Sequence, residues 1–357
     1  MHRRKLLGLS AAAVAAYACG GGGTTLPTVA PAPAPTARDE LDEIAAKIRS
    51  GGPPPDGIPP VEEPRYISVA EASERWDEDA IIDAFTIDGQ PRAYPRMITV
   101  WHEIVNETSA DGPIAITYCP LTGSTIVFSG ALEGGTTTTF GTSGQLYNSN
   151  LVMYDRATDS MWPQLLGTAV RGERKGERLR EIPGAVTTTF GRWKAKYPTG
   201  TVLSTETGHV RPYGTSPYGS YDRDDRIIFP VENHDITYHR KKVVVGIRHK
   251  GGTLAIPKAE FAERRLANTE LAGTPLVALY DPDLDAVRVF DRTTGQGPVG
   301  FAIRDGALVD EETGSHWSPE GQAELGPLAG TKLQQISAYD VMWFAWAAFN
   351  PYTNILE

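Results

Sequence analysis

Cysteine is almost absent from this chain, which contains only Cys19 and Cys119 among 357 residues. A disulfide framework is therefore excluded as the source of its stability. Basic runs are missing beyond the extreme N-terminus and the formal net charge is -10, so nucleic acid is not an expected partner, because phosphate binding needs a basic face. No apolar run reaches the roughly 20 residues that span a bilayer. With 40% hydrophobic residues, the chain can nevertheless bury a large core.

The first nineteen residues have the organisation of an export signal. Basic residues at positions 2–5 precede an apolar stretch at 6–18, and Cys19 follows small residues. This pattern predicts lipidation of Cys19, and therefore an exported protein that is anchored to a membrane and faces the periplasm or the cell surface. A plain cleaved signal with an incidental cysteine is the alternative, and Arg3-Arg4 also fits a twin-arginine signal.

Glycine and proline dominate the segment that follows. Residues 20–63 contain a glycine run and two proline-rich stretches, a composition typical of a disordered tether. We expect the globular part to consist of a first half at 64–205, a Tyr/Gly/Pro connector at 206–230 and a second half at 231–357.

The division into halves comes from an internal repeat. Residues 81–129 align without a gap onto residues 243–291 with ten identical pairs, where average composition would give about three. The pattern Asp-x-x-Thr-x-Ser-x-Trp begins at Asp155 and again at Asp310, and we expect Asp155 to cap a turn. The repeat predicts an α+β fold with an internally duplicated unit, in which two pseudo-symmetric halves pack together.

Each half is expected to contain the same elements. Val/Ile/Thr runs predict strands, and Pro95 suits the first position of a helix. The first half should have strands at 81–87, 113–119 and 125–129, a helix at 95–106 and an aromatic-rich terminal helix at 187–197, which corresponds to 338–349 in the second half. We interpret the second aromatic helix as a buried element or as the seam between the halves.

Residues unique to one half are the best candidates for function, because residues kept in both serve the shared fold. Cys119 and His102 are of this kind, since Asp281 and Arg264 occupy the matching positions. A thiolate and an imidazole suit catalysis or the binding of copper or another thiophilic metal. A small buried cysteine and a core histidine are the structural alternatives.

The surroundings of Cys119 can also be predicted. Because the matching position accepts an aspartate, we expect Cys119 at the rim of a pocket, with His102 or the loop at 148–150 nearby. A crossover between helix 95–106 and strand 113–119 would place the thiol level with the positive end of the helix. Helical geometry directs Glu103 away from the buried side.

Two further segments have weaker functional patterns. Asn148 and Asn150 are weak candidates for cofactor binding, with a simple turn as the alternative. The tyrosine-rich segment 213–221 suits closure over a cleft between the halves, and an ordered linker is the alternative. The histidines at 234, 239 and 249 lack a ligand pattern.

Several strings resemble the family catalogued as domain of unknown function 3179 (DUF3179). They are Arg92-Ala-Tyr-Pro95, Trp101-His-Glu-Ile-Val-Asn106, Thr117-Tyr-Cys-Pro-Leu-Thr-Gly-Ser124, Leu146-Tyr-Asn-Ser-Asn-Leu-Val-Met-Tyr-Asp155 and Phe344-Ala-Trp-Ala-Ala-Phe349. The resemblance spans about residues 64–353 and implies an exported or envelope-associated protein. It implies no activity, so no catalytic residue is transferred from it.

Two hypotheses of function follow. In the first, Cys119 and His102 form a site for metal binding or thiol-based redox chemistry. In the second, the protein is a non-catalytic ligand-binding or structural module of the cell envelope, with a small molecule held in a cleft. The sequence leaves open whether the protein is an enzyme and what its oligomeric state is.

Overall fold

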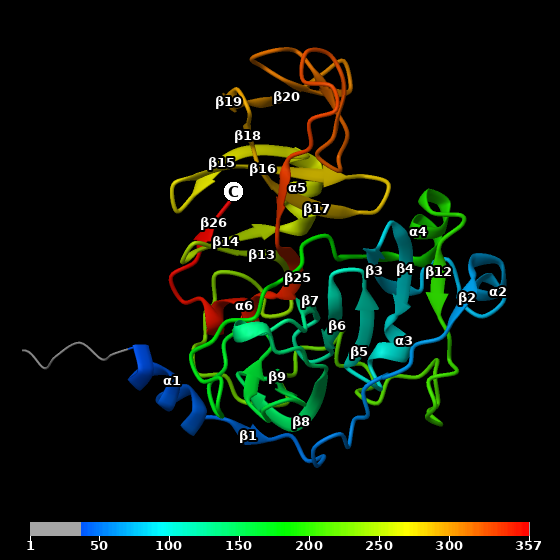
Figure 1. The fold of residues 1–357 in the computed structure, drawn as a ribbon, viewed down its shortest axis with the longest axis vertical. Helices are drawn as coiled ribbons and strands as arrows, with labels where there is room; N and C mark the ends of the chain where they lie inside the picture. The colour runs from blue at the N-terminus through cyan, green and yellow to red at the C-terminus, as the bar shows by residue number, and fades with distance from the viewer. Residues whose placement is uncertain (1–36, 357) are drawn as a thin grey trace, which may run out of the picture. The chain divides into compact units, whose positions relative to one another are not determined.

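A computed structural model describes residues 37–356, which form one compact unit. The predicted export signal, Cys19 and the first part of the predicted tether lie outside the described residues. Strands make up 41% and helices 13% of the structure, so small β-sheets rather than helices build the core of this α+β protein (Figure 1). Among the described residues, no helix is both long and apolar enough to cross a membrane.

Residues 37–63, the described part of the predicted tether, contain a helix and a strand, which corrects the expectation of a disordered tether over this range. Helix α1 (Ala37–Ala46) is followed by strand β1 (Arg49–Ser50), which pairs with β8 (Phe140–Tyr147). Val61 then forms a parallel bridge with Val105. The prolines of this segment are compatible with its pairing to β8 and Val105, because proline is tolerated at the edge of a sheet.

The first half contains three sheets. One is five-stranded in the order β11-β3-β4-β12-β2, one is the antiparallel meander β5-β6-β7, and one is β1-β8-β9-β10. The remaining strands are β2 (Tyr66–Ser68), β3 (Ile81–Ile87), β4 (Gln90–Pro95), β5 (Ile104–Ser109), β6 (Gly112–Cys119), β7 (Ser124–Ser129), β9 (Asn150–Asp155), β10 (Met161–Pro163), β11 (Val186–Thr189) and β12 (Thr201–Leu203), and the helices are α2 (Val69–Ser73), α3 (Arg96–Thr99), the 3-10 turn η1 (Glu133–Gly135) and α4 (Phe190–Lys196).

The second half contains three four-stranded sheets. These are β25-β13-β14-β26, β15-β16-β17-β24 and β20-β21-β22-β23, with the ribbon β18-β19 beside them. The strands are β13 (Val243–His249), β14 (Gly252–Pro257), β15 (Leu266–Leu271), β16 (Thr274–Asp281), β17 (Ala286–Asp291), β18 (Thr293–Thr294), β19 (Gly297–Pro298), β20 (Phe301–Arg304), β21 (Ala307–Asp310), β22 (His316–Trp317), β23 (Ala323–Leu325), β24 (Gln334–Ile336), β25 (Ala338–Met342) and β26 (Asn354–Ile355), and the helices are α5 (Lys258–Arg264) and α6 (Trp343–Phe349).

The strands predicted at 81–87, 113–119 and 125–129 are confirmed, but the predicted helix at 95–106 is wrong beyond Thr99. Helix α3 ends there, and Ile104 already pairs with Thr117 in the β5-β6 hairpin. Glu103 lies between the two with φ 59°, a left-handed conformation that ends a helix. The predicted crossover is therefore wrong as well, because β6 belongs to an antiparallel meander.

The terminal helices are shorter than predicted for a similar reason. Residues 186–189 and 338–342 form strands β11 and β25, which pair with β3 and β13, and only then do α4 and α6 begin. Helix α6 is buried and packs in a core cluster that also contains first-half residues such as Phe128 and Trp162. Its interpretation as a buried aromatic element is confirmed.

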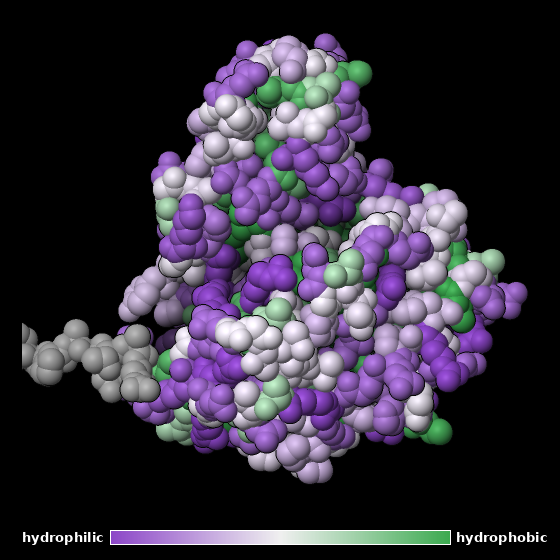
Figure 2. Space-filling view, in the orientation of Figure 1, coloured by the Kyte–Doolittle hydropathy of each residue, from purple (hydrophilic) through white to green (hydrophobic). Residues whose placement is uncertain are grey.

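Hydrophilic residues cover most of the face in Figure 2, with hydrophobic ones in small patches.

Candidate functional site

Cys119 ends strand β6 and is buried, with a 1% exposed fraction. Its sulfur accepts a hydrogen bond from the Leu151 N–H (3.4 Å) and its S–H faces the Ser149 carbonyl oxygen (3.9 Å). Burial raises the pKa of the Cys119 thiol to about 11, and the negative charge of Glu103 adds to the increase. The thiol is thus protonated at neutral pH, which makes it a poor nucleophile and metal ligand.

The prediction that Cys119 is exposed at a pocket rim is wrong, although the expected proximity of the 148–150 loop is confirmed. Asp281, at the matching position, is also fully buried. Its carboxylate is paired with Lys196 (2.9 Å) and Arg288 (3.5 Å) and accepts the Asp283 N–H (3.0 Å). An acidic residue therefore did not indicate exposure, because cations and a backbone donor compensate for its burial.

His102 lies in the turn after α3 and is also buried. Its Nδ1 is 2.7 Å from the Pro59 carbonyl oxygen and its Nε2 is 2.6 Å from the Tyr213 hydroxyl. Burial lowers the pKa of His102 to about 4, so the ring is neutral. Because a carbonyl only accepts, Nδ1–H donates to Pro59 and Nε2 accepts from Tyr213.

The structure does not bring Cys119 and His102 into one site. Each has its own partners, and both ring nitrogens of the histidine are used by the protein itself. Within residues 37–356, no group of three or more His, Cys, Asp or Glu side chains is arranged to hold a metal ion. His102 instead joins the N-terminal segment to the connector.

The loop at 148–150 is a tight turn between β8 and β9, with φ 49° at Asn148 and 59° at Ser149. The Asn148 amide contacts the Glu232 N–H (2.8 Å) and the Ala348 carbonyl (3.4 Å). Asn150 donates to the side chains of Thr122 (3.1 Å) and Gln164 (2.9 Å) and accepts from the Leu165 N–H (2.8 Å). Protein groups satisfy both amides, which supports the turn over the weak cofactor-binding prediction.

Glu103 is the residue that sequence reasoning missed. It was expected to point away from the buried side, but only 5% of it is exposed and it lines a cavity of about 700 Å³. The expectation failed because the helix ends before this residue. Burial raises the pKa of the Glu103 carboxyl to about 8, and a hydrogen bond from Tyr218 opposes part of the shift.

The cavity has a mostly apolar wall drawn from distant parts of the chain. Its apolar side chains include Ile58, Val100, Leu121, Leu146, Leu151 and Phe229. Leu121 and Leu151 lie between the cavity and the thiol. The Leu151 N–H donates to the Cys119 sulfur, and Leu121 follows Cys119 by two residues. Val210 and Ile228, both exposed, stand among the lining residues as well.

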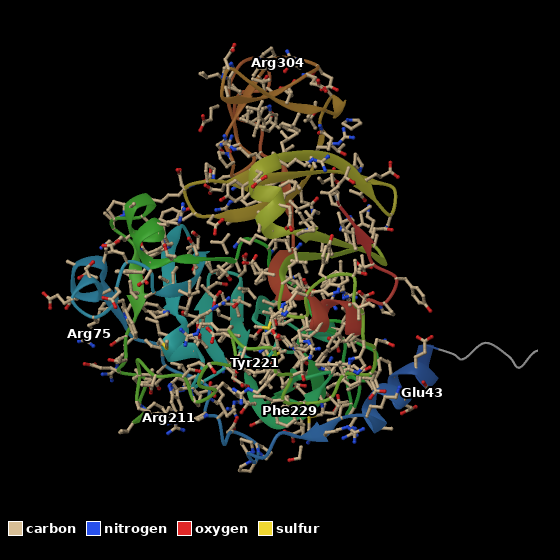
Figure 3. The ribbon with its side chains drawn as sticks, turned by 180° about the vertical axis from the view of Figure 1, so that it is seen from behind. Glu43, Arg75, Arg211, Tyr221, Phe229 and Arg304 are labelled. Atoms are coloured by element: carbon tan, nitrogen blue, oxygen red, sulfur yellow. The ribbon has the colours of Figure 1, made fainter. Side chains whose placement is uncertain are left out.

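The connector forms much of the cavity wall. Figure 3 labels Arg211, Tyr221 and Phe229 along this segment, which has no helix or strand between β12 and β13. The Tyr221 hydroxyl donates to the Leu121 carbonyl (2.9 Å), and Trp101 Nε1 donates to the Thr215 carbonyl (3.0 Å). The tyrosine-rich segment thus covers a cavity, but one within the first half and not a cleft between halves.

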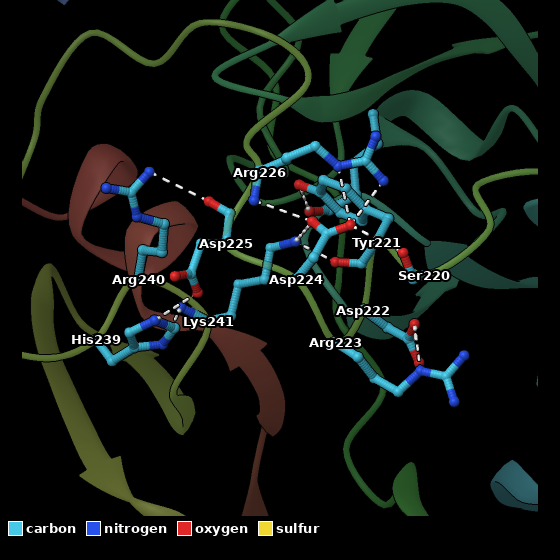
Figure 4. A network of polar contacts seen from close by, with 11 residues as sticks. Ser220, Tyr221, Asp222, Arg223, Asp224, Asp225, Arg226, His239, Arg240 and Lys241 are labelled. Atoms are coloured by element: carbon cyan, nitrogen blue, oxygen red, sulfur yellow. Dashed lines mark hydrogen bonds and ion pairs between the residues drawn. The ribbon is translucent and has the colours of Figure 1, made fainter.

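Polar contacts hold the connector in place (Figure 4). Asp224 is paired with Arg226 (2.6 Å) and contacts Lys241 (3.5 Å). His239 Nε2 lies 2.8 Å from the Asp225 carboxylate, which leaves this histidine in a surface network. Lys241 also donates to the Tyr221 carbonyl. These contacts join the start of the second half to the connector.

The second half has a smaller cavity at the matching place. Its volume is about 310 Å³, and its lining includes Arg265 and Asp283, which lie 162 positions after Glu103 and Leu121 in the repeat alignment. Arg265 has φ 68°, close to that of Glu103. All described residues of this lining fall between 265 and 324, so neither the connector nor residues 51–58 line it.

Fold and site together define a β-rich α+β protein with a covered apolar cavity in its first half. The model of the family described as Protein of unknown function (DUF3179) matches residues 55–353, and the chain belongs to this family. No curated protein and no solved structure matches the chain.

Proposed function

We propose that this protein is a ligand-binding module of the cell envelope that holds a small, largely apolar molecule in the first-half cavity. The observation that carries the proposal is a cavity of about 700 Å³ with apolar walls and one buried carboxyl, that of Glu103. Natural ligand sites have this volume and this mixture of apolar walls with few polar groups.

The covering segments support a binding role. A ligand in this cavity contacts residues 51–58 and 210–229, which are loops held on a rigid framework of sheets, the usual location of binding residues. Exposed Val210 and Ile228 at the lining add apolar surface where a ligand enters.

The Cys119/His102 hypothesis receives less support. A thiol with a pKa near 11 is almost entirely protonated at pH 7, and the two imidazole nitrogens are engaged by Pro59 and Tyr213. Metal binding or thiol redox chemistry would require both groups to give up these arrangements. We therefore place Cys119 and His102 behind the cavity wall, where Cys119 bonds the lining residue Leu151 and His102 precedes the lining residue Glu103.

Export and anchoring remain part of the proposal, on the basis of the N-terminal sequence. Lipidation of Cys19 would hold the module at a membrane, facing the periplasm or the cell surface. A Cys19→Ala variant should then move from the membrane fraction to the soluble fraction. Its retention in the membrane after export would contradict the lipoprotein hypothesis.

We also propose that the halves arose by duplication. Support comes from the strand orders β11-β3-β4-β12 and β25-β13-β14-β26 and from the two meanders. The registers agree as well, since Ile82 pairs with Pro95 and Val244 with Pro257, both shifted by the repeat offset. On this proposal the first half kept or gained a ligand cavity and the second became a support.

The binding proposal is tested by filling one cavity and its counterpart. Leu146→Trp should obstruct the first-half cavity, whereas Leu308→Trp, which also replaces a half-buried lining leucine, should obstruct only the second. Small apolar compounds that raise the melting temperature of the full chain should lose this effect in Leu146→Trp and keep it in Leu308→Trp. Equal behaviour of the folded variants, or no binding by any compound, would overturn the proposal.

A further inference from the structure

We propose that the first-half cavity binds a hydrophobic organic cation, with its ammonium group paired to the Glu103 carboxylate and its apolar part against Leu121, Leu151 and Phe229. This inference rests on the proposed function and names the class of ligand.

Glu103 differs from every other buried acid that the structure describes. Six acidic side chains are buried between residues 37 and 356: Asp83, Glu103, Glu107, Asp155, Asp281 and Asp310. Asp83, Glu107 and Asp281 are paired with Arg96 (3.0 Å), Arg92 (2.6 Å) and Lys196 (2.9 Å).

The two remaining acids are satisfied without a cation. Asp155 accepts hydrogen bonds from Thr158, Ser160 and Trp162, and Asp310 accepts the corresponding set in the second half.

Among residues 37–356, the only side-chain group that hydrogen-bonds the Glu103 carboxyl is the Tyr218 hydroxyl. The titratable groups that respond to its charge are Cys119 and Tyr218, which are acids and supply no positive charge. A buried carboxylate requires a cation or several donors to offset its desolvation. Since the carboxyl lines the cavity, a bound ligand is in position to supply that cation.

The aromatic wall favours the same ligand. Trp101, Tyr218 and Phe229 all line the cavity, and aromatic rings attract an ammonium group through their π faces. Arg211 also lines the cavity, but its charge acts on His102 and not on Glu103, and its guanidinium donates to the Val210 carbonyl. The net charge of -10 further favours a cationic ligand over an anionic one.

Proton linkage gives the proposal a second readout. Because burial raises the pKa of Glu103 to about 8, the carboxyl is mostly neutral in the empty cavity at pH 7. A cation binds the ionised form, so the apparent affinity should rise about tenfold between pH 6 and pH 7 and level off above pH 8. A neutral ligand that accepts a hydrogen bond from the protonated acid would bind more weakly as the pH rises.

The experiment compares three probes with the same apolar part and different head groups. Binding of 3-phenylpropylamine, 3-phenylpropanol and 4-phenylbutanoate, which share the phenylpropyl group, to the full chain is measured by calorimetry from pH 6 to pH 9. We expect the amine to bind at least tenfold more tightly than the alcohol at pH 8 and to show the rising pH profile. Preference for the alcohol or the carboxylate, or a flat profile for the amine, would overturn the inference.

A neutral variant isolates the contribution of the carboxylate. Glu103→Gln should weaken amine binding on the order of 10- to 100-fold and leave alcohol binding within about twofold. Arg265→Gln, at the matching position of the second half, is the control and should change neither. If Glu103→Gln does not fold, the pH profile of the unmodified chain still decides the question.

The outcomes separate this inference from the proposed function. Binding of the alcohol or the carboxylate that is lost in Leu146→Trp, without a preference for the amine, would leave the cavity as a ligand site and reject the cation. Binding of none of the probes, together with no effect of Leu146→Trp on any compound, would reject both.

Discussion

The ends of strands β6 and β16 occupy matching positions but carry different chemistry. Cys119 is a buried thiol beside an apolar cavity, whereas Asp281 is a buried carboxylate bound by Lys196 and Arg288. Lining residues of a cavity flank both positions, but only the carboxylate of Asp281 is held by ion pairs. The comparison shows that positions which match in the sequence alignment can carry either a neutral thiol or an ion-paired carboxylate.

The cavities of the two halves differ in volume because of segments that lie outside the aligned strands. The first is about 700 Å³ and is covered by residues 51–58 and 210–229, whereas the second is about 310 Å³ and has no such cover. Segments that precede and follow the first half thus create the larger cavity. The difference in cavity volume therefore comes with these loops and not with the strands.

Replacing Asp281 is expected to have the largest effect on the free energy of unfolding. Asp281→Ala leaves the buried Arg288 without its acidic partner and Lys196 with Glu320 (2.6 Å) as its remaining close partner. We expect a loss of about 3–5 kcal/mol in the free energy of unfolding. Cys119→Ala, at the matching position, should cost only about 1–2 kcal/mol. Urea denaturation of both variants measures the difference. Equal losses would show that the thiol is as important to the fold as the ion-pair centre.

The two Asp-x-x-Thr-x-Ser-x-Trp turns provide a smaller and symmetric test. Asp155 and Asp310 each bind a tryptophan Nε1 at 2.9 Å. Replacing either by alanine leaves several buried donors unpaired, at a cost of about 2–3 kcal/mol. We expect the two variants to lose similar stability in urea denaturation. A large loss from only one would mean that the turns serve different purposes and would weaken the duplication proposal.

Glu103 should make the first half sensitive to pH in a way that Arg265 does not. Its folded-state pKa of about 8 lies above the ordinary value of 4.5, so its contribution to stability is complete below about pH 4.5 and is lost as the pH rises through 8. Glu103→Gln removes this dependence. The stability difference between variant and parent should change by up to about 1.4 kcal/mol per pH unit in that window, as measured by urea midpoints. Parallel curves would contradict the raised pKa.

The turns near the site could be predicted from the sequence because their hydrogen bonds and backbone conformations are local. The expected turn at Asp155 is confirmed because its carboxylate binds the N–H groups of Thr158 and Ser160, all within one short segment. The loop at 148–150 is likewise a turn whose left-handed residues include asparagine, as expected for this residue type. By contrast, the exposure of Cys119 was inferred from Asp281, whose cationic partners come from α4 and β17.

The sequence by itself determined the strands at 81–87, 113–119 and 125–129 and the family, because side-chain alternation and short-range turn patterns act over a few residues. The tertiary structure alone decided where helix α3 ends, that His102 bonds Pro59 and Tyr213, and that Glu103 faces a cavity. These features depend on segments about 40 to 110 residues apart in the chain. Their contacts form only when the sheets are assembled, so no local pattern records them.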